Sequence, residues 1–132
     1  MPAYQGKGTA NILEANRQKY FWQNETVPAG IFPGSLSVAY QLERGPNIAY
    51  PWGFAVEVQF QGSPGAFEVD VMGAETDAPQ NYIKIGSITA VTSLVAGNYV
   101  GRFDTTALYP KYVALNMTTL GTSGPVTAKI SR

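Results

Sequence analysis

Short runs in which apolar and polar residues alternate are the feature that most limits what this chain can fold into. The clearest run covers residues 53–61. Its apolar side consists of Phe54, Val56, Val58 and Phe60. A period of two places one face of a β-strand against a core and the other face toward solvent. The chain is therefore expected to be built from half-buried β-strands.

Similar runs, bounded by turn residues, recur from residue 35 onward. They predict about seven strands, at residues 35–43, 53–61, 67–72, 82–91, 97–104, 111–118 and 126–131. No convincing helical period separates them, and because parallel strands need helical crossovers, the sheets are expected to be antiparallel. The pattern predicts an all-β fold, an antiparallel β-sandwich or jelly roll. The second and third runs are expected to form a hairpin with Phe60 opposite Phe67.

The first 34 residues differ from the rest of the chain. They contain four Gly and three Pro residues and show no sustained period. We therefore divide the chain into an irregular, extended N-terminal arm, residues 1–34, and a β-sandwich domain, residues 35–132. Residues 10–22 are a candidate for a short helix. Deleting the arm is expected to leave a folded domain that no longer binds its partner.

Large apolar residues in the arm are the candidate partner-binding anchors. They are Tyr20, Phe21, Trp22, Ile31 and Phe32. Aromatic residues outside a core commonly bind in a pocket of a partner. The cluster at residues 20–22 can equally cover an open end of the chain's own sandwich, and the sequence leaves both interpretations open.

The composition argues against several classes of function. Nine Lys and Arg residues balance nine Asp and Glu residues, and because the basic residues are scattered singly, we expect no nucleic-acid partner. The charged fraction is 14%, well below the roughly 25% that is typical, as expected of a surface that partners cover. No apolar run approaches the roughly 20 residues that span a bilayer, and the N-terminus lacks the features of a signal peptide. We therefore expect a soluble protein, made in a cytoplasm, with no membrane partner.

The sequence is poor in residues that carry catalysis. It contains no His and no Cys, which removes the commonest general base and all thiolate chemistry. Paired carboxylates are the remaining option, because the expected hairpin would place Glu57 opposite Asp70. A plain solvent-exposed face explains the same pair, and we favour it. We expect no enzyme, with no catalytic residue, no cofactor and no metal assigned.

Two other groups of residues are candidates for binding. Glu75 and Asp77 lie in a polar loop and could contribute to a Ca²⁺ site, but two carboxylates are too few to specify one, and we favour a plain surface loop. The candidate surface aromatic contacts are Tyr50, Trp52, Tyr109 and Tyr112. A carbohydrate-binding module or adhesin would use such rings as a stacking platform. The edge of a core or a protein contact would use the same rings, so a glycan partner remains an alternative.

Two stretches of the chain carry a family resemblance. Residues 67–78, FEVDVMGAETDA, lead through an acidic loop to Tyr82, and residues 109–120, YPKYVALNMTTL, close on VTAKI at residues 126–130. Both resemble segments of the small β-sandwich structural proteins of tailed bacteriophages, and the resemblance covers about residues 53–131.

This resemblance implies a virion structural protein, a capsid cement or decoration subunit on the capsid surface. Its partners would be the major capsid protein and copies of itself in a homo-oligomer. A tail or head-fibre subunit is the alternative within the same family.

Overall fold

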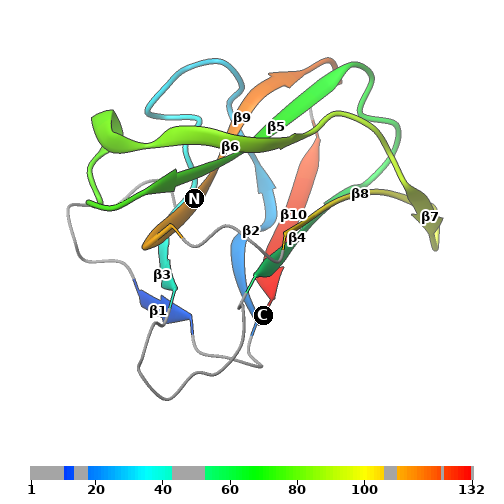
Figure 1. Cartoon of the computed structure of the whole chain (residues 1–132). Coiled ribbons are helices and arrows are strands. Elements are labelled where there is room, and N and C mark those ends of the chain that lie inside the picture. The colour runs from blue at the N-terminus through cyan, green and yellow to red at the C-terminus, as the bar shows by residue number, and fades with distance from the viewer. Residues whose placement is uncertain (1–10, 14–17, 43–52, 106–109, 123, 132) are drawn as a thin grey trace.

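The computed structural model describes residues 11–13, 18–42, 53–105, 110–122 and 124–131. These residues form two five-stranded sheets that pack face to face as a β-sandwich (Figure 1). Sheet A consists, in spatial order, of β1 (Asn11–Leu13), β3 (Tyr40–Leu42), β9 (Tyr112–Leu120), β5 (Phe67–Ala74) and β6 (Ile83–Ile88). Sheet B consists of β2 (Gln18–Thr26), β10 (Pro125–Ser131), β4 (Phe54–Phe60), β8 (Asn98–Thr105) and β7 (Ser93–Val95). The predicted β-sandwich is confirmed.

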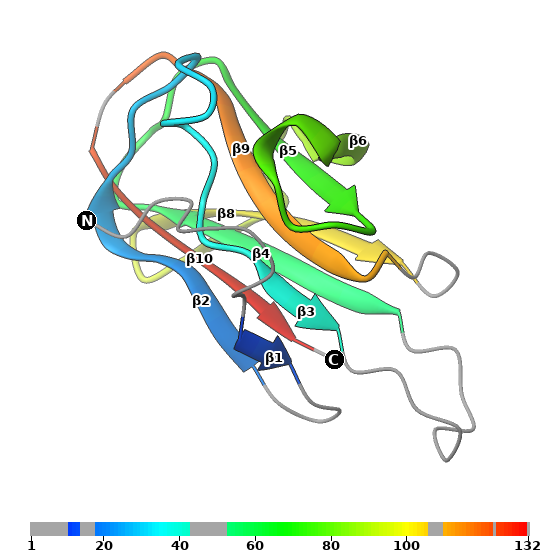
Figure 2. The ribbon, with the colours of Figure 1, turned by 90° about the vertical axis from the view of Figure 1, so that its left-hand side faces the viewer.

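The strand pairings are antiparallel with one exception. β1 pairs with β3 in parallel, with Asn11 opposite Tyr40, so the expectation of purely antiparallel sheets is wrong at this edge. The one helical element among the described residues is a 3-10 turn, Pro79–Asn81, between β5 and β6. Figure 2 shows the two layers from the side, with β9, β5 and β6 in one and β2, β10 and β4 in the other.

The main core lies between the sheets and follows the alternation in the sequence. β4 buries every second residue, as predicted. Val56 and Val58 on this strand meet Val69 of β5 and Leu115 of β9 in the same buried cluster. Each of these side chains gains roughly 1.5–3 kcal/mol from leaving water, which is why the alternating pattern predicts the fold class so directly.

β4 and β5 do not form the predicted hairpin. β4 pairs with β8 and β10 in sheet B, whereas β5 pairs with β6 and β9 in sheet A. The rings of Phe60 and Phe67 still meet, with centroids 4.7 Å apart, but they do so across the sandwich. The connection at residues 61–66 is therefore an arch from one sheet to the other. Alternation cannot separate the two cases, because a hairpin and an arch bury the same residues.

Residues 18–26 are a strand and not part of an irregular arm or a helix. β2 pairs with β10 along its length, and Phe21 and Trp22 are both buried in the main core. Two neighbouring residues share one face because Ala128 opposes Trp22 and Lys129 opposes Tyr20, which leaves Phe21 as the extra residue of a β-bulge. The bulge breaks the period of two and hides the strand from the sequence pattern. Phe21 and Trp22 are thus core residues rather than partner anchors, and deleting residues 1–34 would remove an integral strand.

The outer face of sheet A carries a second, smaller core. It is made by Leu36, Ala39, Met72, Ala74, Tyr82, Tyr112 and Ala114. Leu36 forms a single bridge to Asn116 of β9, and β3 pairs with the same strand further along, so the predicted strand at residues 35–43 is interrupted. Across the interruption the chain changes face, since Leu36 packs outside sheet A while Tyr40 and Leu42 belong to the main core.

The predicted strand at residues 82–91 ends early. β6 stops at Ile88, and the chain then crosses to sheet B, where β7 pairs with β8. β6 packs closely over β8 at Gly86. A Cβ atom at this position would lie only 2.2 Å from the ring of Phe103, so only glycine fits there. Since β6 is the last strand of sheet A on this side, β7 extends beyond the region that sheet A covers.

Candidate functional site

The five predicted anchors do not form one site. Phe21 and Trp22 are buried, whereas Tyr20, Ile31 and Phe32 are exposed. Tyr20 lies on β2 of sheet B, opposite Lys129, and its backbone oxygen accepts a hydrogen bond from the Tyr40 hydroxyl. Ile31 and Phe32 lie in the segment that follows β2, which packs against β9 of sheet A. The exposed apolar pair of this segment is the candidate contact site.

The segment from residue 28 to residue 34, here called the apolar loop, is firmly held. The Gly30 N–H donates to the Met117 carbonyl at 2.9 Å, and the Ser35 N–H donates to the Ile31 carbonyl at 2.9 Å. Beyond the loop, the Met117 N–H donates to the Ser35 carbonyl at 3.1 Å. Gly30 has a φ of +73°, a conformation that residues with a side chain rarely adopt, and this turn directs the chain along β9.

The apolar loop leaves its two largest side chains in solvent. Ile31 is 65% exposed and Phe32 is 46% exposed. Single exposed apolar residues are common on protein surfaces, but two adjacent ones on a loop fixed by backbone hydrogen bonds form a preorganised contact. Such a contact is suited to binding a protein surface, because little conformational entropy remains to be lost on association.

A polar network fixes the base of the loop on the outer face of sheet A. The Ser35 hydroxyl donates to Asn116 Oδ1 at 2.6 Å, and Asn116 Nδ2 lies 3.3 Å from Thr118 Oγ1. The Thr118 hydroxyl in turn donates to Asp70 Oδ2 at 2.9 Å. Ser35 is completely buried, so this network satisfies a group that would otherwise be costly to bury. The loop and the middle of sheet A are therefore one connected unit.

The network ends in a cluster of two carboxylates and one lysine. Lys84 Nζ lies 3.0 Å from Glu68 Oε2 and 3.5 Å from Asp70 Oδ1. Burial raises the pKa of Asp70, and the neighbouring Glu68 raises it further. The pKa of Glu68 is held below its usual value by its hydrogen bond with Asp70 and by Lys84. Asp70 therefore takes up a proton more readily than Glu68, and the contacts within the cluster explain both pKa shifts.

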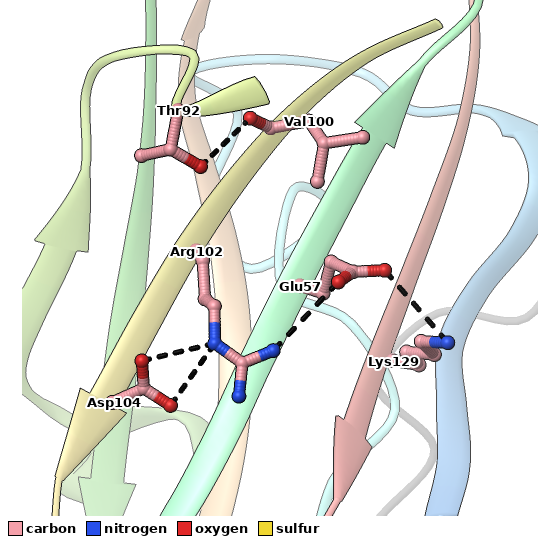
Figure 3. A network of polar contacts seen from close by, with 6 residues as sticks. All are labelled: Glu57, Thr92, Val100, Arg102, Asp104 and Lys129. Carbon is pink, nitrogen blue, oxygen red and sulfur yellow. Dashed lines mark hydrogen bonds and ion pairs between the residues drawn. The ribbon is translucent and has the colours of Figure 1, made fainter. Parts of the chain in front are cut away.

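The outer face of sheet B carries a network of charged side chains (Figure 3). Glu57 lies between two basic residues, with Arg102 Nη1 3.7 Å from one carboxylate oxygen and Lys129 Nζ 3.7 Å from the other. Arg102 also pairs with Asp104 at 2.9 Å, which raises the pKa of the guanidinium. Two acidic and two basic side chains on this face are thus paired with one another.

The carboxylate pair considered for catalysis is not formed. Glu57 lies on sheet B, opposite Arg102 and Lys129, whereas Asp70 lies on sheet A, opposite Asn116 and Ser87. The reason is the arch between β4 and β5, which sends the two strands to different sheets. The pairing predicted from the hairpin is therefore wrong, and with it the basis for a glycosidase-like acid pair.

The acidic loop after β5 is more buried than a plain surface loop. Asp77 is 2% exposed, and its Oδ1 accepts a hydrogen bond from the Tyr82 hydroxyl at 2.7 Å. Glu75 Oε2 accepts a hydrogen bond from the Lys111 N–H at 2.8 Å. The two carboxylates thus hold different parts of the chain. Within the described ranges, no three His, Cys, Asp or Glu residues gather in a way that could hold a metal ion.

A shallow depression of about 400 Å³ lies at the end of sheet A. It is lined by Gly73, Ala74, Glu75, Thr76, Asn81, Ile83, Ile85 and Pro110. Ile83 is 67% exposed at its rim. The sequence pattern did not indicate this depression, because its lining comes from three separate segments.

The aromatic residues considered for glycan binding are of two kinds. Tyr112 is buried in the small outer core, so its ring is not a surface platform, and this candidate is wrong. Tyr50, Trp52 and Tyr109 lie outside the described residues. Of the four candidates for glycan binding, the one that the structure describes therefore has no exposed ring.

Comparisons with known proteins return no relative for the chain. No family model, no curated protein and no solved structure matches it. Among the described residues, no helix has the length and apolar character needed to cross a membrane.

Proposed function

We propose that this chain is a virion structural protein, a capsid cement or decoration subunit that binds the major capsid protein lattice through its apolar loop. The observation that carries the proposal is the exposed pair Ile31 and Phe32, presented on a loop that β9 holds in place. A cement protein needs anchors of this kind, because it stabilises a lattice by burying its own surface on several neighbours.

The energetics of the loop support a protein partner. Large side chains that become fully buried at the centre of an interface commonly contribute about 2 kcal/mol or more each. Hydrogen bonds to β9 fix the backbone on both sides of the pair, at Gly30 and at Ser35. Binding therefore needs little reorganisation of the chain, and most of the gain from burying the two side chains remains available.

The assignment to a virion rests on the resemblance of residues 53–131 to structural proteins of tailed bacteriophages. The low charged fraction, 14%, agrees with a surface that neighbouring subunits cover. The same features fit a tail or head-fibre subunit, which would differ in its location on the particle. A non-catalytic role is part of the proposal, supported by the absence of His and Cys from the sequence and by the separation of Glu57 from Asp70 on different sheets.

The experiment is a binding assay on phage heads that lack the protein. The purified wild-type chain is expected to cosediment with the heads and to raise the temperature at which they release DNA. The double variant Ile31→Ser/Phe32→Ser should lose roughly 1,000-fold in affinity, since two anchors of about 2 kcal/mol each are removed. Both residues are exposed, so the variant should fold normally, which its thermal unfolding checks.

The matched control is Ile83→Ser, which alters an equally exposed isoleucine at a different edge of sheet A. This control should bind heads like the wild type. Full affinity of the double variant would contradict the proposed contact, and absence of wild-type binding to heads would contradict the cement function. Binding to purified tails alone would assign the chain to the tail.

A further inference from the structure

Strand β7 forms an exposed, uncharged edge of the sandwich. Sheet B ends at β7, so one side of this strand has no neighbour among the described strands. Leu94 is 63% exposed and Val95 is 56% exposed. Residues 85–101 contain no charged residue and no proline. An uncharged apolar edge of this kind is a template for pairing with another strand.

The two long edge strands are protected in the ways that natural sheets commonly use. β2, at the opposite edge of sheet B, carries Lys19 and Glu25 and contains the bulge at Phe21. β6, at the edge of sheet A, carries Lys84 and a register irregularity opposite Val71 and Met72. Charges and bulges discourage strand addition. β7 carries no charge and no bulge, so pairing is less hindered at this edge than at β2 or β6.

The β7–β8 hairpin presents this edge in a fixed conformation. Its turn, Ala96-Gly97, has positive φ values of 50° and 82°, as the tight two-residue turns of β-hairpins require. At the other end of β7, the Thr92 N–H and the Thr92 hydroxyl both donate to the Val100 carbonyl, at 2.7 and 3.1 Å. A second strand would therefore meet an edge that is already ordered.

The position of the hairpin leaves room for a second molecule. β6 ends sheet A over β8, so no strand of sheet A lies over β7. Figure 1 shows β7 at one extreme of the molecule, on the side away from β1 and β3. Two copies can therefore bring these hairpins together while their sandwiches remain apart.

We propose that β7 is a self-association site, at which two copies of this chain pair edge to edge about a two-fold axis at Leu94. In this arrangement Leu94 lies opposite Leu94 of the second copy, and Ser93 lies opposite Val95 of the second copy. Leu94 pairs with Tyr99 in the hairpin, a residue that packs against the main core, so the two leucines lie on the inner-face side of a continuous sheet B. Directly opposed side chains have Cβ atoms about 4.5–5.5 Å apart, so each leucine covers the other.

A second copy is the partner that fits this edge best. Closed dimers use the same patch on both subunits, and a patch without charge meets its own copy without repulsion. A charged partner strand would find no opposite charge on β7. The pairing is short, with only three residues in each strand, so the contact area lies well below the roughly 1,200 Å² of a stable interface. The contact is therefore weak in free solution and effective where copies are held close together.

This contact deepens the proposed function, since a lattice would supply the close spacing, but its test needs only the free protein. The chain contains no cysteine, so a single Leu94→Cys substitution provides one defined thiol. Under mild oxidation, Leu94→Cys should form disulfide-linked dimers about tenfold or more faster than Ile83→Cys, a control with a similar exposed edge position. Equal rates for the two variants would overturn the proposal.

A second measurement fixes the register. A mixture of Ser93→Cys and Val95→Cys should cross-link about tenfold faster than either variant alone, because only the mixture places a thiol opposite a thiol. Faster cross-linking of either variant with itself would overturn the two-fold register at Leu94. Thermal unfolding of each reduced variant verifies that the fold is intact.

The double variant Leu94→Lys/Val95→Lys separates this proposal from the cement function. Sedimentation at rising concentration should show weak self-association of the wild type and none of the variant, while single copies of the variant still bind heads through the apolar loop. The proposal would be overturned if the wild type stays monomeric at millimolar concentration and the variant no longer binds heads. That result would mean that a strand of the capsid protein, and not a second copy, pairs with β7.

Discussion

The two sheets of this sandwich treat their outer faces differently. The outer face of sheet A carries a second core around Leu36 and Met72, together with the partly buried network that joins Ser35 to Asp70. The outer face of sheet B carries matched charges at the surface, with Glu57 between Arg102 and Lys129. Sheet A is thus packed on both sides and holds the apolar loop, whereas sheet B is half solvated. The proposed capsid contact therefore lies on the side of the molecule whose outer face is packed.

The sharpest test of this comparison is one substitution made on each side. Leu36→Ala should lower the free energy of unfolding by about 2–5 kcal/mol, because Leu36 is fully buried in the outer core of sheet A. Leu94→Ala at the exposed edge of sheet B should change it by about 0.5 kcal/mol or less. Urea denaturation of both variants measures the difference. Similar losses in the two variants would contradict the view that the outer face of sheet A is packed like a core.

The pH dependence of stability tests the buried end of the polar network. Burial raises the pKa of the Asp70 carboxyl above its ordinary value of 3.8. At a pH between 3.8 and the raised pKa, Asp70 keeps its proton in the folded state but has lost it in the unfolded state. The free energy of unfolding contributed by this group therefore falls as the pH rises through that window. Asp70→Asn removes the titration and retains an acceptor for the Thr118 hydroxyl. The variant should gain stability relative to the wild type from pH 3 toward pH 7, as followed by the melting temperature.

This expectation would be contradicted if the melting temperature of the wild type rises relative to that of Asp70→Asn as the pH is raised. Such a rise would mean that Lys84 stabilises the Asp70 carboxylate by more than burial destabilises it. The covered face of sheet A would then be stabilised by its ion pairs in the same way as the open face of sheet B.

The smallest effect is expected on sheet B. Glu57→Gln should reduce the free energy of unfolding by about 0.2–1 kcal/mol, because Arg102 and Lys129 are partly solvated and solvent weakens both ion pairs. High salt should remove most of this difference, since exposed charges are screened. Chemical denaturation with urea at low and high salt provides the measurement. A loss of several kcal/mol that salt does not affect would show that the outer face of sheet B is as constrained as that of sheet A.

Alternation in the sequence predicts the fold where a strand is regular and half buried. Residues 53–61 contain β4, in which one residue in two is buried, and residues 97–104 contain most of β8. β2 is missed because its bulge places Phe21 and Trp22 on the same face, and β7 is missed because the chain changes sheets after Ile88. Local patterns report which side chains are buried, but they carry no information about which strand becomes the neighbour.

The same limit applies to the candidate site. Ile31 and Phe32 were recognisable as large apolar residues in a segment without a period, and they are exposed. The sequence could not distinguish them from Phe21 and Trp22, because burial of the latter pair depends on β10, a strand more than 100 residues away. The network from Ser35 to Asp70 was not recognisable either, since it joins three segments that only the fold brings together.

The position of β10 determines when the molecule can fold. This strand follows every other described strand in the chain, yet it lies between β2 and β4 in sheet B. While the chain leaves the ribosome, β2 and β4 have no partner between them until the residues of β10 emerge. Sheet B is therefore completed only after synthesis of β10, and a nascent chain must keep Phe21, Trp22 and Val58 from aggregating until that moment. Folding dominated by such distant pairings is expected to be slow, on the order of milliseconds to seconds.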